Sequence, residues 1–204
     1  MKLLKKSIAI ILTVTALTAQ AQDKALMNAF SQSYDYEAIQ KYDAAISSIN
    51  AVYVATSYEM NVRLGWLNYL AGKNKESVGF YDKAIALMPA ATEPIWAVIN
   101  PLTKLQSWND IEKHYLSIIK LDSKNANANY NLAMIYYYRK DYNNAKKYFD
   151  VSLNLYPFGY NNMLMTAWTN YFLGSKNEAK TLFNKVLLYS PNDKSALEGL
   201  SYIK

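Results

Sequence analysis

Few side chains in this sequence have the types and spacing that catalysis requires. Its 204 residues include a single histidine, His114, and no cysteine. A lone histidine with no nucleophile or carboxylate motif beside it is more often a packing or surface residue than a catalyst. The sequence also lacks Gly-x-Ser-x-Gly, a phosphate-cradling glycine-rich loop and a histidine pair for zinc. We therefore expect no enzyme, no cofactor and no metal site.

The elements that would position any functional side chain recur at a constant spacing along the chain. In the stretch Asn125–Pro157, two apolar patterns with helical period are separated by the polar break Arg139-Lys140-Asp141, and a proline closes the unit. This pattern predicts a pair of helices joined by a short turn, repeated along the chain. The residues that close successive units, each 34 positions apart, are Pro89, Ser123, Pro157 and Pro191.

Each unit resembles the tetratricopeptide repeat (TPR), which has the same period of about 34 residues. The family carries small residues at positions 8, 20 and 27 and an aromatic ring near position 24. Small side chains let the two helices approach closely, and the ring fills the space beside them. Three of the four units match this pattern well, whereas the unit 92–125 has isoleucine at all three small positions and matches by spacing only. Counted from Tyr58, position 8 holds Gly65, Ile99, Ala133 and Ala167; position 20 holds Ser77, Ile111, Ala145 and Ala179; position 27 holds Ala84, Ile118, Ser152 and Val186; and position 24 holds the rings Tyr81, Tyr115, Phe149 and Phe183.

The resemblance implies an all-α fold, a right-handed α-solenoid of TPR helix-turn-helix repeats with a C-terminal capping helix. In the capping helix, Leu197 and Leu200 are expected to face back onto the solenoid. The expected organisation is a cleavable signal peptide at 1–21, a degenerate first TPR or N-terminal cap at 22–57, four TPR repeats at 58–193 (58–91, 92–125, 126–159 and 160–193), and the capping helix at 194–204.

The degenerate first unit can be aligned with the second by its side chains. Glu37 would match Glu76 and Tyr42 would match Tyr81, so that both pairs share one offset in residue number. This alignment predicts a short leading helix around residues 24–33 and places Glu37 on the helix that follows.

Three positions carry backbone signals. Gly72 and Gly174 each suit the left-handed turn that ends a helix. Pro101 lies inside the first helix of the third unit, where proline costs about 3 kcal/mol or forces a kink. We therefore expect the third unit to be bent, with a local change in the curvature of the superhelix.

The N-terminal segment predicts export. Three lysines in the first six residues precede an apolar stretch at 8–17, and Ala19-Gln20-Ala21 has the small-x-small pattern of a signal-peptidase site. An uncleaved membrane anchor is the alternative, but the apolar run is shorter than the roughly 20 residues that a spanning helix needs. Cleavage would lower the formal charge from +6 to +3 by removing those three lysines. We expect a periplasmic or secreted protein without stable membrane insertion and without a nucleic-acid partner.

The resemblance also implies a binding groove, lined by positions 2, 5, 6, 9, 12 and 13 of each first helix. Asparagine donates and accepts hydrogen bonds, and a tryptophan or tyrosine contact can contribute about 2 kcal/mol, so such a groove suits a peptide segment. Alternatively, the rings pack only between repeats. The expected groove residues are Arg63, Trp66, Tyr69, Trp96, Asn100, Tyr130, Asn131, Met134, Tyr137, Trp168 and Tyr171.

Together these features predict a non-catalytic scaffold of the cell envelope that binds a protein or peptide segment of unknown identity. Two alternatives stay open. The first is a structural subunit of an envelope complex, held through its convex face or its termini. The second is a carbohydrate binder or an enzyme that uses the aromatic groove, although neither an acid–base pair nor a nucleophile is evident.

Overall fold

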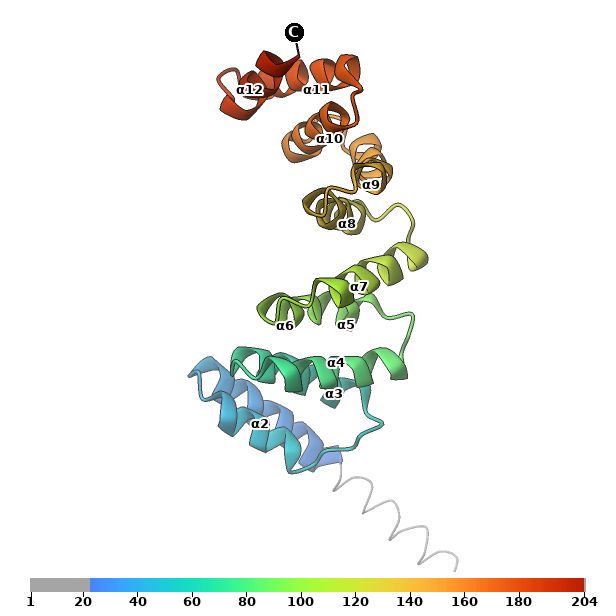
Figure 1. Ribbon diagram of the computed structural model, residues 1–204. Helices are drawn as coiled ribbons and strands as arrows, with labels where there is room; N and C mark the ends of the chain where they lie inside the picture. The colour runs from blue at the N-terminus through green and yellow to red at the C-terminus, as the bar shows by residue number, and fades with distance from the viewer. Residues whose placement is uncertain (1–22, 204) are drawn as a thin grey trace, which may run out of the picture. The chain divides into compact units, whose positions relative to one another are not determined.

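The computed structural model describes residues 23–203, and all regular structure in that range is helical (Figure 1). The all-α prediction is therefore confirmed. The expected signal peptide falls within residues 1–22, outside the described residues. The described chain divides into two compact units between Leu105 and Gln106, inside the expected repeat 92–125. None of the helices described is long and apolar enough to cross a membrane.

The first unit is a stack of helices whose core lies largely between its second and third helices. That core is built from Ala45, Ile46, Ile49, Met60, Leu64 and Leu67. Gly65 lies directly under the ring of Tyr81, and the Ser77 hydroxyl donates a 2.7 Å hydrogen bond to the Gly65 carbonyl. The helices are residues 23–38, α2 (Tyr42–Asn50), α3 (Tyr58–Leu70), α4 (Asn74–Leu87), α5 (Thr92–Ala97) and α6 (Ile99–Lys104).

The second unit continues the pattern of paired helices. Its larger core cluster consists of Met163, Ala167, Ala179, Leu182, Phe183, Val186 and Ala196, and a smaller one of Ala133, Ala145 and Phe149. In both clusters small residues lie beside a fully buried ring, as close helix crossing requires. The helices are α7 (Trp108–Leu121), α8 (Ala126–Tyr138), α9 (Tyr142–Leu155), α10 (Tyr160–Phe172), α11 (Lys176–Tyr189) and α12 (Lys194–Tyr202).

The turn inside each repeat places one residue in the left-handed conformation. Gly72 and Gly174 adopt φ values of 75° and 81°, as expected, while Gln40, Gln106 and Lys140 hold the same position at 58°, 56° and 62°. After four of these five residues, the next backbone N–H donates to the carbonyl five residues earlier. This bond satisfies a free carbonyl at the helix end, so the turn persists where glycine is absent.

The alignment expected for the first repeat is wrong. Its turn residue, Gln40, corresponds to Gly72, so the true offset is seven positions shorter than the expected one. In this register the buried Ala45 and Ile49 match Ser77 and Tyr81, all at most 2% exposed. The leading helix extends over residues 23–38, longer than expected, and Glu37 belongs to it. Because seven positions are nearly two helical turns, both registers align apolar residues on the same face of the helix.

Pro101 interrupts the first helix of the third repeat, as expected. The helix is divided at Val98 into α5 and α6. Proline has no N–H to donate to the carbonyl four residues earlier, and its ring crowds that carbonyl. Hydrogen bonds resume from Leu102 to Val98 at 3.2 Å and from Leu105 to Pro101 at 3.0 Å. The interruption is therefore local to one turn.

The last helix begins at Lys194, in register with the first helices of the four repeats. Leu200 packs against the larger core cluster of the second unit, as expected, and so do Ala196 and Gly199, which are buried. The expectation for Leu197 is wrong, because this side chain is 48% exposed. The corresponding residues of earlier repeats, such as Met163, are covered by the helix that follows them, and no described helix follows α12.

Buried asparagines fasten the loops that enter two of the first helices. The Asn61 side-chain amide donates to the carbonyls of Ala55 and Ser57, at 2.9 and 2.6 Å. Asn129, two repeats later, donates to the carbonyls six and four residues before it, at 3.1 and 2.8 Å. These two amides are therefore used for structure and are withdrawn from any ligand.

Candidate functional site

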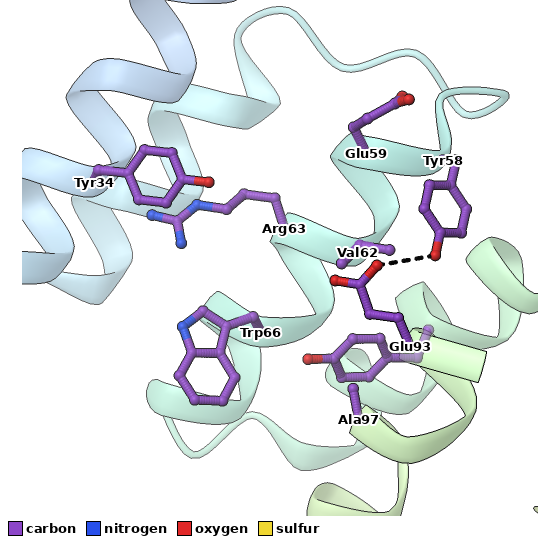
Figure 2. Close-up of a pocket in the computed structure, with 9 residues that line it drawn as sticks. Tyr34, Tyr58, Glu59, Val62, Arg63, Trp66, Glu93 and Ala97 are labelled. Atoms are coloured by element: carbon purple, nitrogen blue, oxygen red, sulfur yellow. Dashed lines mark hydrogen bonds between the residues drawn. The ribbon is translucent and has the colours of Figure 1, made fainter. Parts of the chain in front are cut away.

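A pocket of about 390 Å³ lies within the first unit, and helix 23–38, α3 and α5 contribute most of its walls (Figure 2). Most of these side chains come from first helices, at positions expected to face a groove. Tyr81 of α4 also lines the pocket and is almost fully buried. The lining residues are Tyr34, Tyr58, Glu59, Val62, Arg63, Trp66, Tyr81, Glu93 and Ala97.

Arg63 is the buried cation of this pocket, with only 6% of its surface exposed. Its Nε donates a 3.0 Å hydrogen bond to the Ser33 hydroxyl, and Nη1 forms an ion pair with Glu37. The guanidinium lies over the ring of Tyr34, 3.8 Å from its centroid. Nη2 has no hydrogen-bond partner among the described residues. The guanidinium is therefore held in one orientation while one of its nitrogens is left without a partner.

The Glu37 carboxylate joins Arg63 to Trp66. One oxygen accepts from Arg63, and the other accepts a 2.7 Å hydrogen bond from the Trp66 indole N–H. The Trp66 ring packs at a tilt against Tyr69, with centroids 5.8 Å apart, and 36% of the residue remains exposed. One carboxylate thus fixes both a cation and an aromatic face at the edge of the pocket.

The opposite side of the pocket is acidic. Glu93 accepts a 3.2 Å hydrogen bond from the Tyr58 hydroxyl, and Glu59 accepts one from Ser57 at 3.0 Å. Neither glutamate forms an ion pair with another described residue. Burial, together with the charge of Glu93, raises the pKa of both Tyr58 and Tyr81. Negative charge therefore dominates this side.

In the second unit, aromatic side chains of α8, α9 and α10 form a continuous cluster. The rings of Tyr142 and Phe172 are stacked, with centroids 4.7 Å apart, and Tyr137 and Trp168 lie 6.1 and 6.0 Å from Phe172. Burial and the nearby tyrosines raise the pKa of Tyr137 to about 12. Phe172 is 46% exposed and the neighbouring Tyr138 is 75% exposed. The cluster therefore offers solvent an aromatic surface supported by ring packing.

The structure brings only some of the expected groove residues of the first unit together. Arg63 and Trp66 line the pocket, and Tyr69 supports Trp66 from outside it. Trp96 is half-buried and Asn100 is exposed, and neither lines the pocket. Of the expected groove residues of this unit, only Arg63 and Trp66 therefore line the same pocket.

In the second unit the expected residues are largely engaged in packing. Tyr130 lies against Phe149, with centroids 5.6 Å apart, and lines a second pocket of about 440 Å³. The side chain of Asn131 donates to a carbonyl of its own helix at 2.8 Å, and Met134 packs against the smaller core cluster. Tyr137 and Tyr171 each contact several rings.

Trp168 connects α10 to the last helix. Its indole N–H donates a 2.9 Å hydrogen bond to the Ser195 hydroxyl, and its ring meets Phe183 edge-on at 5.1 Å. For this residue the contacts match the alternative interpretation, in which a groove ring packs between repeats. Trp168 therefore serves the docking of α12 directly.

Three residues that hold the pocket together were not expected from the sequence: Ser33, Tyr34 and Glu37. All three lie on helix 23–38, which the wrong register shortened. In the observed register, Tyr34 corresponds to Trp66 and Glu37 to Tyr69, which are groove positions. The sequence signal for the correct register is the lysine that follows each turn residue, Lys41 after Gln40 and Lys73 after Gly72. The two turns also share their backbone conformation.

No group of three or more His, Asp or Glu side chains in residues 23–203 is placed to hold a metal ion.

The sequence matches two family models for the tetratricopeptide repeat, one over residues 126–158 and the other over residues 162–193. No curated protein matches the sequence. The structure is similar to that of MamA, at 15% identity and a TM-score of 0.68, covering 88% of this chain and 96% of that one.

Two further solved structures have the same fold. A tetratricopeptide repeat protein from Parabacteroides merdae ATCC 43184 gives a TM-score of 0.71 at 19% identity, covering 88% of this chain and 72% of that one. YrrB, a TPR protein with an unusual peptide-binding site, gives 0.69 at 12% identity, covering 92% and 97%. Identities this low establish the fold and nothing about ligands. Residues 126–158 and 162–193 thus carry tetratricopeptide repeats, and the all-helical fold of the described residues is that of TPR solenoids.

Proposed function

We propose that this protein is a non-catalytic scaffold that binds a protein or peptide segment through the concave face formed by its first helices. The observation that carries the proposal is the pocket of the first unit, where Arg63, Trp66 and Glu93 converge from α3 and α5. Side chains of both charges and an aromatic face are held there by their own hydrogen bonds. Such a preorganised surface binds without first paying the entropy of ordering.

The fold supports this proposal at a general level. The TPR fold serves protein–protein interaction, and proteins of this family are typically scaffolds rather than catalysts. The solved structure of YrrB is that of a TPR protein with a peptide-binding site. We extend peptide binding to this chain because its own groove positions carry partly exposed polar and aromatic side chains.

The aromatic cluster of the second unit supplies a second contact surface for the same role. Tyr138 and Phe172 present exposed ring area on a packed support. Aromatic side chains of this kind dominate the energetics of protein interfaces, because they bury a large area at little entropic cost. We propose that this surface contributes affinity to a bound partner.

We also propose that the protein acts in the cell envelope after removal of residues 1–21. The support is the positive n-region, the apolar stretch and Ala19-Gln20-Ala21. Mass spectrometry of the intact protein recovered from its host would find a chain that begins at Gln22. A recovered chain that still begins at Met1 contradicts cleavage.

Selection of binders from a random peptide library displayed on phage tests the groove. Selected peptides are measured against the purified protein and against Trp66→Ala and Phe172→Ala. The matched control is Leu188→Ala on α11, which removes a side chain that is 76% exposed on a second helix. Circular dichroism confirms that each variant is folded.

We expect at least one of the two groove variants to weaken the selected peptides by about tenfold or more, whereas the control leaves affinity unchanged. If only Leu188→Ala weakens binding, the protein is held through its convex face, as the structural-subunit alternative requires.

A further inference from the structure

We propose that the pocket of the first unit accepts a lysine or arginine side chain from an extended peptide segment. Glu93 would take the cation, and Nη2 of Arg63 would donate to a main-chain carbonyl of the same segment. This inference rests on the proposed function, because it specifies which segment the groove selects.

The charges that line the pocket favour a cation. Arg63 is the only basic lining residue, and its charge is already offset by Glu37. The carboxylates of Glu59 and Glu93 remain without an ion-pair partner among the described residues. Their effect extends into the pocket, since the charge of Glu93 contributes to the raised pKa of Tyr58 and of Tyr81. An anionic ligand would meet the unpaired carboxylates of Glu59 and Glu93 there, whereas a cation would be attracted by them.

The unused nitrogen of Arg63 is a second and independent indication of a ligand. Nη2 is buried and has no hydrogen-bond partner among the described residues, although the rest of the guanidinium is held by Ser33, Tyr34 and Glu37. A buried donor without an acceptor costs free energy, so a ligand that supplies an acceptor oxygen gains affinity. A main-chain carbonyl supplies that oxygen without adding negative charge beside Glu37.

The remaining walls suit the stem of a long basic side chain. Val62, Ala97 and the ring of Tyr81 provide apolar surface. Trp66 and Tyr58 present aromatic rings, which attract a cation and pack against its methylenes. Figure 2 shows the Arg63 guanidinium beside the ring of Tyr34 and the Glu93 carboxylate directed at the Tyr58 hydroxyl, with Trp66 on a further side of the pocket. The volume of about 390 Å³ lies in the range of pockets that enclose small ligands.

Titration of the purified protein with defined probes tests the inference. Binding is followed in NMR spectra through the indole N–H resonance of Trp66. The probes are three acetylated and amidated pentapeptides of alanine whose central residue is lysine, norleucine or glutamate. A fourth probe, n-butylammonium, carries the cation without a peptide backbone. The variants are Glu93→Gln and, as matched control, Glu76→Gln, which also removes an acidic charge from a first helical turn.

We expect the lysine peptide to bind at least about tenfold more tightly than the norleucine peptide, and the glutamate peptide to bind most weakly. The butylammonium ion should bind at least about tenfold more weakly than the lysine peptide, because it lacks the acceptor for Arg63. Glu93→Gln should remove most of the preference for lysine, and Glu76→Gln should leave it unchanged.

Different failures point to different conclusions. Equal binding of the lysine and norleucine peptides, or tightest binding of the glutamate peptide, overturns the inference while peptide binding by the groove stands. Butylammonium binding as tight as that of the lysine peptide overturns the role given to Arg63. If no peptide shifts the Trp66 resonance and the phage library also yields no groove-dependent binder, the proposed function fails as well.

Discussion

Adding one methyl group to each of two helical glycines of the first unit should change its stability by clearly different amounts. Gly65 lies in the middle of α3 and Gly79 in the middle of α4. Replacing glycine by alanine inside a helix stabilises it by about 1 kcal/mol, because alanine loses less conformational freedom on folding. This gain applies equally to both positions, so any difference between the two variants comes from packing.

The structure gives the size of that difference. A Cβ at Gly65 would lie 2.7 Å from two ring carbons of Tyr81, whereas ordinary contacts begin near 3.4 Å. The Tyr81 ring is 2% exposed and cannot move aside into solvent. Forcing extra volume into a packed core costs about 1–3 kcal/mol. At Gly79 the new Cβ meets nothing within 4 Å. Gly65→Ala should therefore be less stable than Gly79→Ala by about 1–3 kcal/mol.

Urea unfolding followed by circular dichroism measures both variants against the unmodified protein. Gly79→Ala should raise the free energy of unfolding, and Gly65→Ala should leave it lower than that of Gly79→Ala by the amount given above. Repeating the Gly65 substitution in a Tyr81→Leu background should remove most of the penalty, because the two side chains then no longer compete for one space. Equal stabilisation by the two glycine substitutions would refute the close packing of α3 against Tyr81.

Three further predictions concern helix ends and charge. Burial alone would raise the pKa of Glu112, but hydrogen bonds from Arg139 and Tyr136 and the charge of Arg139 outweigh it and lower that pKa. Glu112→Gln should therefore cost about 1 kcal/mol at neutral pH, and urea titrations should show this cost vanishing as pH falls below about 4. A cost that is the same at pH 3 would contradict this. Pro101→Ala should restore an N–H donor and join α5 to α6, which protection of the new amide from hydrogen exchange would reveal; an unprotected amide would count against it. Lys140→Gly should raise the free energy of unfolding by up to about 1 kcal/mol by relieving a left-handed residue, and Gly174→Ala should lower it by a similar amount; the same sign for both would be inconsistent with the turn geometry.

The repeat period and the helix boundaries could be predicted from sequence because local backbone physics sets both. Gly72 and Gly174 marked helix ends through their conformational freedom, and the polar break Arg139-Lys140-Asp141 marked the turn at Lys140. The turn at Gln106 lies 34 positions before Lys140, which is one repeat period. The period therefore carried more information than the identity of any turn residue.

The register of the first repeat could not be fixed in the same way. Aligning Glu37 with Glu76 preserved the apolar phase, because the error of seven positions is nearly two helical turns. Only the position of the left-handed residue, Gln40, separates the two registers. Sequence periodicity does not detect such a shift wherever the turn lacks glycine or proline.

The same limit explains what was missed in the pocket. Arg63 and Trp66 were expected on a groove face from their repeat positions, and both line the pocket. Arg63 and Trp66 both donate to one carboxylate, that of Glu37. This pairing could not be expected from the sequence, because it depends on the register of the preceding helix and on side-chain conformations. Pairings across helices are set by three-dimensional packing, which the pattern within one helix does not contain.

The hydrogen bond from the Trp66 indole to Glu37 also gives the protein an intrinsic optical reporter. A ligand that enters the pocket changes the polarity around an indole that is 36% exposed, and its emission wavelength should shift in response. The chain has three other tryptophans, Trp96, Trp108 and Trp168. With those three replaced by phenylalanine, the fluorescence of the remaining indole would report the occupancy of the pocket without any attached dye.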